Sequence, residues 1–250
     1  MSKKHGIAKR YANAFERASK AWREALSYAK KATKPDFSVE KLYGMVISAH
    51  HLGGFKPVLK EAMRLEEQLI DSKQTLSERG ETKIENLLLR QGNVEITRPS
   101  GKNNFFLFKR RQLYLVARRS DQVKPDLFAV EQPSAQSRWV RALLAEVKVT
   151  ADNLLYAAVE NARQIRYLRL SQNNLPSIGR GLERNRKGVP VCGAVIVDEP
   201  FFKAHHGEMK SFEDLVVKLR EGSNLRISLL VLRKDTTKPL VLSYEAGNWS

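Results

Sequence analysis

Two charged residues stand inside an apolar run near the middle of the chain, in the segment LLAEVKVT (143–150). The run reads as a β-strand, and side chains two positions apart in a strand point the same way, so Glu146 and Lys148 share one face. An acid and a lysine are costly to bury without partners. We interpret them as part of a functional site, the alternative being an edge strand with a solvated ion pair.

A second acid, Asp126, lies in the preceding strand-like segment KPDLFAVE (124–131). If the two strands pair side by side, two carboxylates and one ammonium group converge on one point. Two hard oxygen donors that leave several water molecules in place suit Mg²⁺ or Mn²⁺. The residues therefore predict a divalent-metal site made by Asp126 and Glu146, with Lys148 beside it.

The order Pro125-Asp126, nineteen residues, then Glu146-Val147-Lys148 resembles the motif of the PD-(D/E)xK nuclease superfamily. The resemblance covers roughly residues 80–232 and is sharpest between 122 and 170. It implies Mg²⁺- or Mn²⁺-dependent hydrolysis of phosphodiester bonds, with Asp126, Glu146 and the carbonyl of Val147 as metal ligands. Lys148 would orient or activate the attacking water and stabilise charge that develops on the phosphate.

Further site residues follow from the same resemblance. Such nucleases commonly add an acid from the preceding helix, a few residues after a glycine, and Gly80 with Glu85 matches this habit. Glu81, one helical turn away, is the alternative. RecB-like members also carry a glutamine and a tyrosine on the helix after the second motif. Gln164 is expected in the site on this basis, whereas Tyr167, at a different spacing, is either a site residue or a core residue.

The charge balance points to a polyanionic partner: nucleic acid is the leading candidate and an anionic membrane surface is the second, and the family resemblance implies DNA. Lys and Arg total 44 against 27 acids, a formal net charge of +17. Each phosphate neutralised by such residues releases a condensed counterion. A solvated surface is the usual alternative for a charge run. The candidate nucleic-acid-binding residues are Arg163, Arg166, Arg169, Arg180, Arg184, Arg186, Lys187, Lys109, Arg110 and Arg111.

Two regions are expected from the residue patterns. Residues 1–75 predict an all-helical N-terminal region, with helices over 7–32, 38–50 and 57–72. Residues 76–250 predict an α/β domain. For this domain the resemblance implies a restriction-endonuclease-like core, a central mixed β-sheet with flanking helices. Its expected elements are helices over 77–90, 152–170 and 211–221, and strands over 93–97, 104–108, 112–117, 122–130, 143–150, 191–198 and 226–232.

The remaining features suit a cytoplasmic protein without a membrane anchor. No apolar run approaches the roughly 20 residues of a membrane helix, and the first residues lack the apolar segment of a secretory signal. The single cysteine, Cys192, excludes an internal disulfide and is expected to be buried. A weaker reading makes the basic amphipathic helix at the N-terminus a membrane or partner anchor.

The expected function is a Mg²⁺-dependent endodeoxyribonuclease, serving in restriction, defence, a mobile element or repair. The alternative is a non-catalytic, basic nucleic-acid-binding or assembly protein that uses its charge and fold alone. A homodimer or a companion subunit is compatible with the nuclease, because cutting both strands of a duplex usually takes two active sites.

Overall fold

The structure is a computed structural model, which describes residues 2–52, 80–97, 104–111, 115–118, 121–131, 141–150, 152–171, 190–233 and 241–247. Within these ranges, the side chains of residues 2–11, 104, 109–111, 116–118, 121–122, 171 and 241 are not described. The third predicted N-terminal helix, over 57–72, and the expected boundary between residues 75 and 76 lie outside the described residues.

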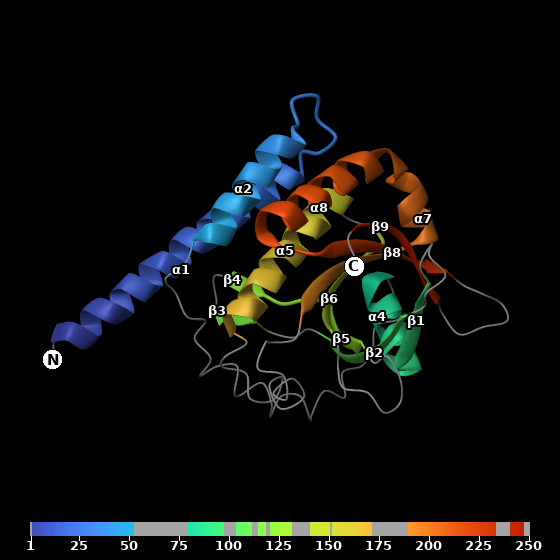
Figure 1. The fold of residues 1–250 in the computed structure, drawn as a ribbon, viewed down its shortest axis with the longest axis horizontal. Helices are drawn as coiled ribbons and strands as arrows, with labels where there is room; N and C mark the ends of the chain where they lie inside the picture. Colours follow the sequence, from blue (N-terminus) through green and yellow to red (C-terminus); the bar gives the residue numbers. More distant parts are fainter. Residues whose placement is uncertain are drawn as a thin grey trace.

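A closed β-barrel forms the centre of the molecule (Figure 1). Neighbouring strands in it are antiparallel from β1 to β6, parallel from β6 to β8, and antiparallel again between β8 and β9. Strands β3 (Val116–Arg118) and β4 (Asp121–Val123) form a separate hairpin. The barrel strands, in order, are β1 (Asn93–Thr97), β2 (Asn104–Arg111), β5 (Leu127–Glu131), β6 (Arg141–Lys148), β7 (Val191–Asp198), β8 (Ile227–Arg233) and β9 (Val241–Gly247).

This closure corrects the fold expected from the sequence. The predicted restriction-endonuclease-like core, with an open mixed sheet, is wrong, because the sheet closes on itself. The strand responsible is β9, which the sequence analysis did not predict. It pairs with β8 in antiparallel fashion and with β1 in parallel, where Leu242 lies opposite Ile96.

The inner face of the barrel packs around one helix, α4 (Gly80–Gln91). Ile84 and Leu88 of α4 join an apolar cluster with alternate residues of the barrel strands, among them Ala145 and Val147 of β6. Because both faces of the central strands are covered, β6 and β7 are buried over nearly their whole length. Cys192 lies in this inner cluster and is buried, as expected from its apolar surroundings.

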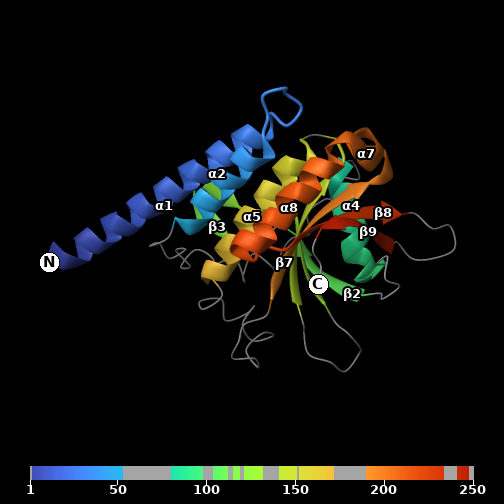
Figure 2. The ribbon, with the colours of Figure 1, turned by 45° about the horizontal axis from the view of Figure 1, so that its top comes forward.

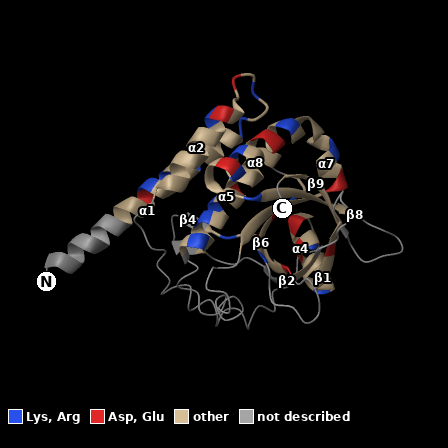
Figure 3. Ribbon diagram, in the orientation of Figure 1, with Lys and Arg blue, Asp and Glu red and all other residues tan. Residues whose placement is uncertain are grey.

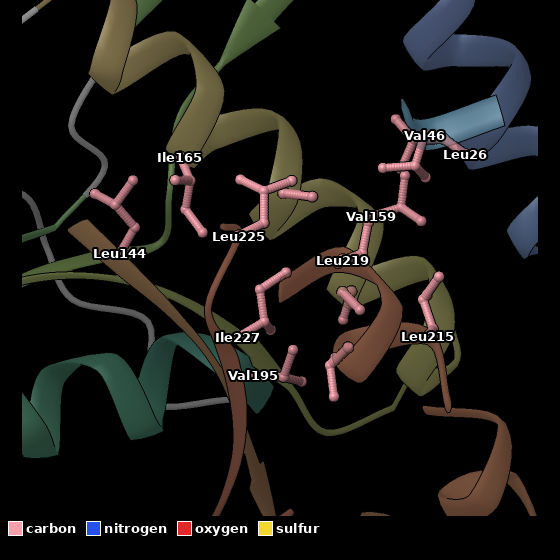
Figure 4. Close-up of a cluster of buried hydrophobic side chains, with 14 of the residues drawn as sticks. Leu26, Val46, Leu144, Val159, Ile165, Val195, Leu215, Leu219, Leu225 and Ile227 are labelled. Atoms are coloured by element: carbon pink, nitrogen blue, oxygen red, sulfur yellow. The ribbon is translucent and has the colours of Figure 1, made fainter. Parts of the chain in front are cut away.

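Four helices cover the outer face of the barrel (Figure 2). Two of them, α5 (Leu154–Ser171) and α8 (Met209–Ser223), pack against the strands, while α1 (Ser2–Ala29) and α2 (Val39–His51) pack on α5 and α8. Figure 4 shows how these layers interlock: Leu26 and Val46 meet Val159 of α5, and Leu219 of α8 lies near Ile227. A short helix, α7 (Glu199–Ala204), and the turn His206–Glu208 link β7 to α8.

Local capping explains where the site-bearing helix begins. Asn153 lies just before α5, and its Oδ1 accepts a hydrogen bond from the Tyr156 amide at 2.8 Å, which is the usual role of an N-cap residue. Its Nδ2 donates to the Ala29 carbonyl at 3.0 Å, so the same side chain joins the end of α1 to the start of α5. Among the helices that the structure describes, none has both the length and the apolar character that crossing a membrane requires.

Candidate functional site

Glu146 and Lys148 lie on the outer face of β6, turned towards α5. Their neighbours Ala145 and Val147 point into the inner cluster, so the strand alternation puts the two charged side chains opposite. Both are nearly buried, at 3% and 7% exposed. The Lys148 Nζ lies 3.3 Å from Glu146 Oε2. The strand is central in the barrel, so the alternative of an edge strand with solvated charges does not describe this pair.

Asp126 lies immediately before β5, beside Glu146. The register pairs Leu127 with Ala145, and one step further along the antiparallel strands brings Asp126 opposite Glu146. Its Oδ2 accepts a hydrogen bond from the Val147 amide at 2.9 Å. The three motif residues Asp126, Glu146 and Lys148 are therefore brought together by two paired strands.

Helix α5 places two polar side chains over this group. Gln164 Nε2 donates to Glu146 Oε1 and, at 3.3 Å, to the Lys124 carbonyl. One helical turn earlier, Glu160 Oε2 lies 3.3 Å from Lys148 Nζ. Residues four apart on a helix share a face, which is why both reach β6. The sequence analysis predicted Gln164 but missed Glu160, although the four-residue step back from Gln164 was a signal that could have found it.

A close contact between α5 and the barrel fixes these side chains in place. Asn161 Nδ2 donates to the Leu144 carbonyl at 3.0 Å and to the Ala194 carbonyl at 3.4 Å, so α5 is tied to both β6 and β7. This approach depends on Gly193, because a Cβ there would lie 1.5 Å from Asn161 Oδ1. A glycine in β7 thus allows α5 to lie near enough for Glu160 and Gln164 to reach their partners.

Of the two candidate helix acids, Glu81 and Glu85, Glu81 interacts electrostatically with the motif residues. Burial raises the pKa of Glu81, Lys148 lowers it, and Asp126 raises it further, so this side chain is within electrostatic reach of the motif residues. The carboxylates that act most strongly on Lys148 are those of Glu146, Glu160, Asp126 and Glu81, and Glu85 is not among them. Glu85 is 3% exposed, one turn further into the helix.

Negative charge dominates the cluster, which we name the carboxylate cluster: Glu81, Asp126, Glu146, Lys148 and Glu160. Burial raises the pKa of Glu146 well above its usual value, and Asp126 and Glu160 raise it further. Burial alone would lower the pKa of Lys148, but the carboxylates outweigh it and raise the pKa. Lys148 is therefore a permanent cation. With one ammonium for four carboxyl groups, the cluster favours protons or a bound cation.

The oxygen ligands of the cluster suit a hard divalent cation. In this structure, however, Glu146 and Glu160 form ion pairs with Lys148. Carboxylate oxygens are preferred ligands of Mg²⁺ and Mn²⁺. Among the described residues, however, no three His, Cys, Asp or Glu side chains form a ready ligand group. The Glu146 oxygens face Gln164 and Lys148, and Asp126 Oδ2 accepts from the Val147 amide. Val147, the predicted carbonyl ligand, is buried and pairs with Ile196 of β7.

Lys and Arg residues are blue in Figure 3, some of them on α5. The predicted basic residues on this helix differ in their surroundings. Arg163 is 8% exposed and lies over the Tyr167 ring, with 5.8 Å from guanidinium carbon to ring centroid. Tyr167 itself is buried and contacts Phe15 edge-on, which makes it a core residue. Arg169 donates to the Asn224 carbonyl at 2.8 Å, at the C-terminal end of α8, where it caps the helix.

The other predicted nucleic-acid-binding residues are less defined. Lys109, Arg110 and Arg111 lie in β2, where the register shifts between Phe108 and Arg110. The structure does not describe their side chains. The loop residues lie outside the described residues altogether; they are Arg180, Arg184, Arg186 and Lys187.

Comparison of the chain with protein-family models, with curated proteins and with solved structures finds no match in any of the three. Any functional assignment therefore depends on the chemistry of the site itself. That chemistry combines adjacent acids on two strands, a buried lysine that stays protonated, and a helix whose Glu160 and Gln164 orient the acid and the lysine.

Proposed function

We propose that this protein is a metal-dependent endonuclease that hydrolyses DNA phosphodiester bonds. Its motif residues resemble those of the PD-(D/E)xK nucleases. The observation that carries the proposal is that Asp126 and Glu146 lie opposite each other on neighbouring strands, with the buried Lys148 ammonium 3.3 Å from Glu146 Oε2. Buried carboxylates in excess of their counter-charge are a common feature of sites that bind a cation and perform chemistry.

The ligands of Mg²⁺ or Mn²⁺ would be Asp126 and Glu146, with Glu81 from α4 beside them. When bound, the ion would supply a Lewis acid and lower the pKa of a coordinated water molecule. The raised pKa of Glu146 implies that this carboxyl releases its proton as a cation binds, because the cation then favours the charged form. Gln164 holds one oxygen of Glu146 and so orients the carboxylate.

Lys148 contributes positive charge and not proton abstraction. The surrounding carboxylates raise its pKa, so it stays protonated at any physiological pH. A fixed ammonium group can orient the attacking water and stabilise the negative charge that develops on phosphate oxygens. Glu160 restrains this ammonium from the α5 side, at 3.3 Å.

The substrate class is proposed from charge. The net charge of +17 favours a nucleic acid, whose phosphates basic side chains would contact. Phosphate contacts of this kind position a duplex without reading its sequence.

The direct test compares cleavage of supercoiled plasmid by the wild type, Asp126→Asn and Lys148→Met, in Mg²⁺, in Mn²⁺ and in EDTA. We expect cleavage by the wild type with either metal, none in EDTA, and a loss of about a hundredfold or more in each variant. The control is Arg90→Gln, an exposed arginine on α4 outside the cluster, which should retain wild-type activity. Undiminished cleavage by both site variants would refute the assignment.

A second candidate is a nucleic-acid-binding protein without catalysis. It is favoured by one observation, the closed ion-pair group in which Lys148 contacts Glu146 and Glu160 while no ready metal-ligand group forms among the described residues. Titration of the protein with Mn²⁺ in a calorimeter separates the two candidates. The nuclease predicts binding that Asp126→Asn abolishes, whereas the binding protein predicts none in either form.

A further inference from the structure

A second charged group lies on the other side of α5 and is entirely basic. His50 stands near the end of α2, Arg166 and Arg169 lie on the last turns of α5, and Arg226 precedes β8. We name these four residues the α2–α5 basic cluster. Gln164 and Arg166 are two residues apart, which is a rotation of about 200° around a helix, so the cluster is separate from the carboxylate cluster.

Two polar atoms in the cluster are buried without a hydrogen-bond partner among the described residues: His50 Nδ1 and Arg166 Nε. His50 is 8% exposed, whereas its neighbour His51 is exposed. A buried polar atom left unpaired costs free energy comparable to a lost hydrogen bond, and most such atoms in folded proteins are satisfied. Within the described part of the chain neither atom has a partner, so both are open to a bound ligand.

The charges around these atoms repel one another. Burial, the largest cause, together with Arg166, His51 and Arg169 lowers the pKa of His50 to about 4. Burial likewise lowers the pKa of Arg166 and of Arg169. The positive charges of Arg166 and Arg226 also lower the pKa of Arg169. Within the described part of the chain, no carboxylate forms an ion pair with Arg166, Arg169 or Arg226.

We propose that the α2–α5 basic cluster is a phosphate-binding site, in which Arg166 and His50 hold the phosphate group. Partly buried cations without counter-charge are costly, and an anion removes that cost. The planar fork of an arginine matches phosphate oxygens in geometry, and the resulting hydrogen bonds are charge-assisted. Arg169 is held by the Ser223 and Asn224 carbonyls and adds charge from a fixed position.

Binding at this site is coupled to protonation of His50. The charged groups that act on its imidazole are Arg166 and Arg169 from α5 and His51 from α2, all basic. A phosphate among them favours the imidazolium, so the pKa of His50 rises when the anion binds. By linkage, phosphate affinity increases as pH falls towards the pKa of the free protein, about 4.

The proposal is tested in EDTA, so that its outcome does not depend on metal or on cleavage. Two probes are used: inorganic phosphate, with chloride as the reference salt, and a short duplex DNA. Histidine proton resonances are followed by NMR from acid to neutral pH, and the His50 resonance is identified by its absence in His50→Gln. Affinities are measured for the wild type, Arg166→Gln and Arg90→Gln.

We expect the His50 pKa to rise on saturation with at least one probe. Arg166→Gln should weaken that binding about tenfold, as loss of a charge-assisted hydrogen bond does, while Arg90→Gln changes it less than about twofold. A response to DNA alone assigns the phosphate to a nucleic-acid backbone, and a response to inorganic phosphate assigns it to a free phosphate compound. The proposal is overturned by an unchanged His50 pKa with both probes, or by equal losses in Arg166→Gln and Arg90→Gln.

Discussion

At the scale of single residues, the carboxylate cluster shows which site residues can be predicted from the alternation of side chains in a strand. Glu146 and Lys148 share a face because they are two apart in β6, and this followed from the sequence. Asp126 was placed beside them by assuming that its strand pairs with β6, as β5 does. Strand alternation could not place Glu160, because its contact with Lys148 depends on α5 lying over β6; only its four-residue step from Gln164 pointed to it.

The first residue-scale prediction concerns Glu146 and pH. A carboxyl with a raised folded-state pKa stabilises the folded protein while protonated, and this contribution is lost as pH rises through the raised pKa. Glu146→Gln should therefore raise the melting temperature near pH 8 and change it little below about pH 4, where the carboxyl is protonated in both states. Thermal unfolding across this range measures the effect.

The same melting experiment with added MgCl₂ tests whether Glu146 binds the cation. A cation that binds the folded protein raises the melting temperature by mass action. MgCl₂ should stabilise the wild type near neutral pH more than it stabilises Glu146→Gln. Equal stabilisation of the two proteins would argue against Glu146 as a ligand.

The second residue-scale prediction concerns Glu160, which we regard as a positioning residue for Lys148. Glu160→Gln removes one of the two carboxylates within 3.3 Å of the ammonium group, so Lys148 is less restrained. We expect single-turnover cleavage to slow by about tenfold, while DNA affinity in EDTA stays unchanged. A drop in affinity of the same size would indicate a role in substrate binding instead.

At the scale of elements, the contact between α5 and the barrel decides whether the cluster assembles. Asn161 bridges β6 and β7, and Gly193 leaves the space for it. The apolar run of β7 was correctly read as a buried strand, and α5 was expected over 152–170. The sequence did not predict how closely α5 approaches β7, because a glycine in a strand can mark a bulge, a bend or a close contact.

The element-scale prediction is that Gly193→Ala separates α5 from the barrel. The added methyl would overlap Asn161, and overpacking of this kind typically costs about 1–3 kcal/mol. Chemical denaturation measures the loss, and cleavage should fall because Glu160 and Gln164 move away from β6. The matched control is Gly44→Ala in α2, where nothing lies within 4 Å of the new Cβ; helix propensity should stabilise that variant by roughly 0.5–1 kcal/mol.

A double variant checks the cause. Asn161→Ala should recover part of the stability that Gly193→Ala loses, because it removes the side chain with which the methyl overlaps. Additive losses in the double variant would mean that the methyl disturbs something other than this contact.

At the scale of the whole molecule, most elements were predicted, but their assembly was not. Within the described residues, the expected helices and most expected strands correspond to elements of the structure, whereas β9 and α7 were missed; the expected helix over 57–72 lies outside them. The error in fold came from β9, whose partner β1 lies far away in the chain. Pairing between distant segments leaves no local pattern, and so an open sheet was expected where a closed barrel forms.

The whole-molecule prediction is that the closing strand is needed for stability. Leu242 is fully buried in the inner cluster, opposite Ile96. Leu242→Ala should cost about 2–5 kcal/mol, the usual range for a buried leucine. Val217→Ala, at an exposed position of α8, serves as the control and should change stability by less than about 0.5 kcal/mol. A similar small change in Leu242→Ala would show that the barrel does not depend on β9.

The junction of β1 and β9 also limits how two copies of the chain could associate. Every strand of the barrel has a hydrogen-bonded neighbour on both sides, so the barrel offers no unpaired edge to a strand from another molecule. Joining two copies by intermolecular strand addition would first require breaking this junction. A dimer able to cut both strands of a duplex would therefore have to meet through surfaces other than the paired strands of the barrel.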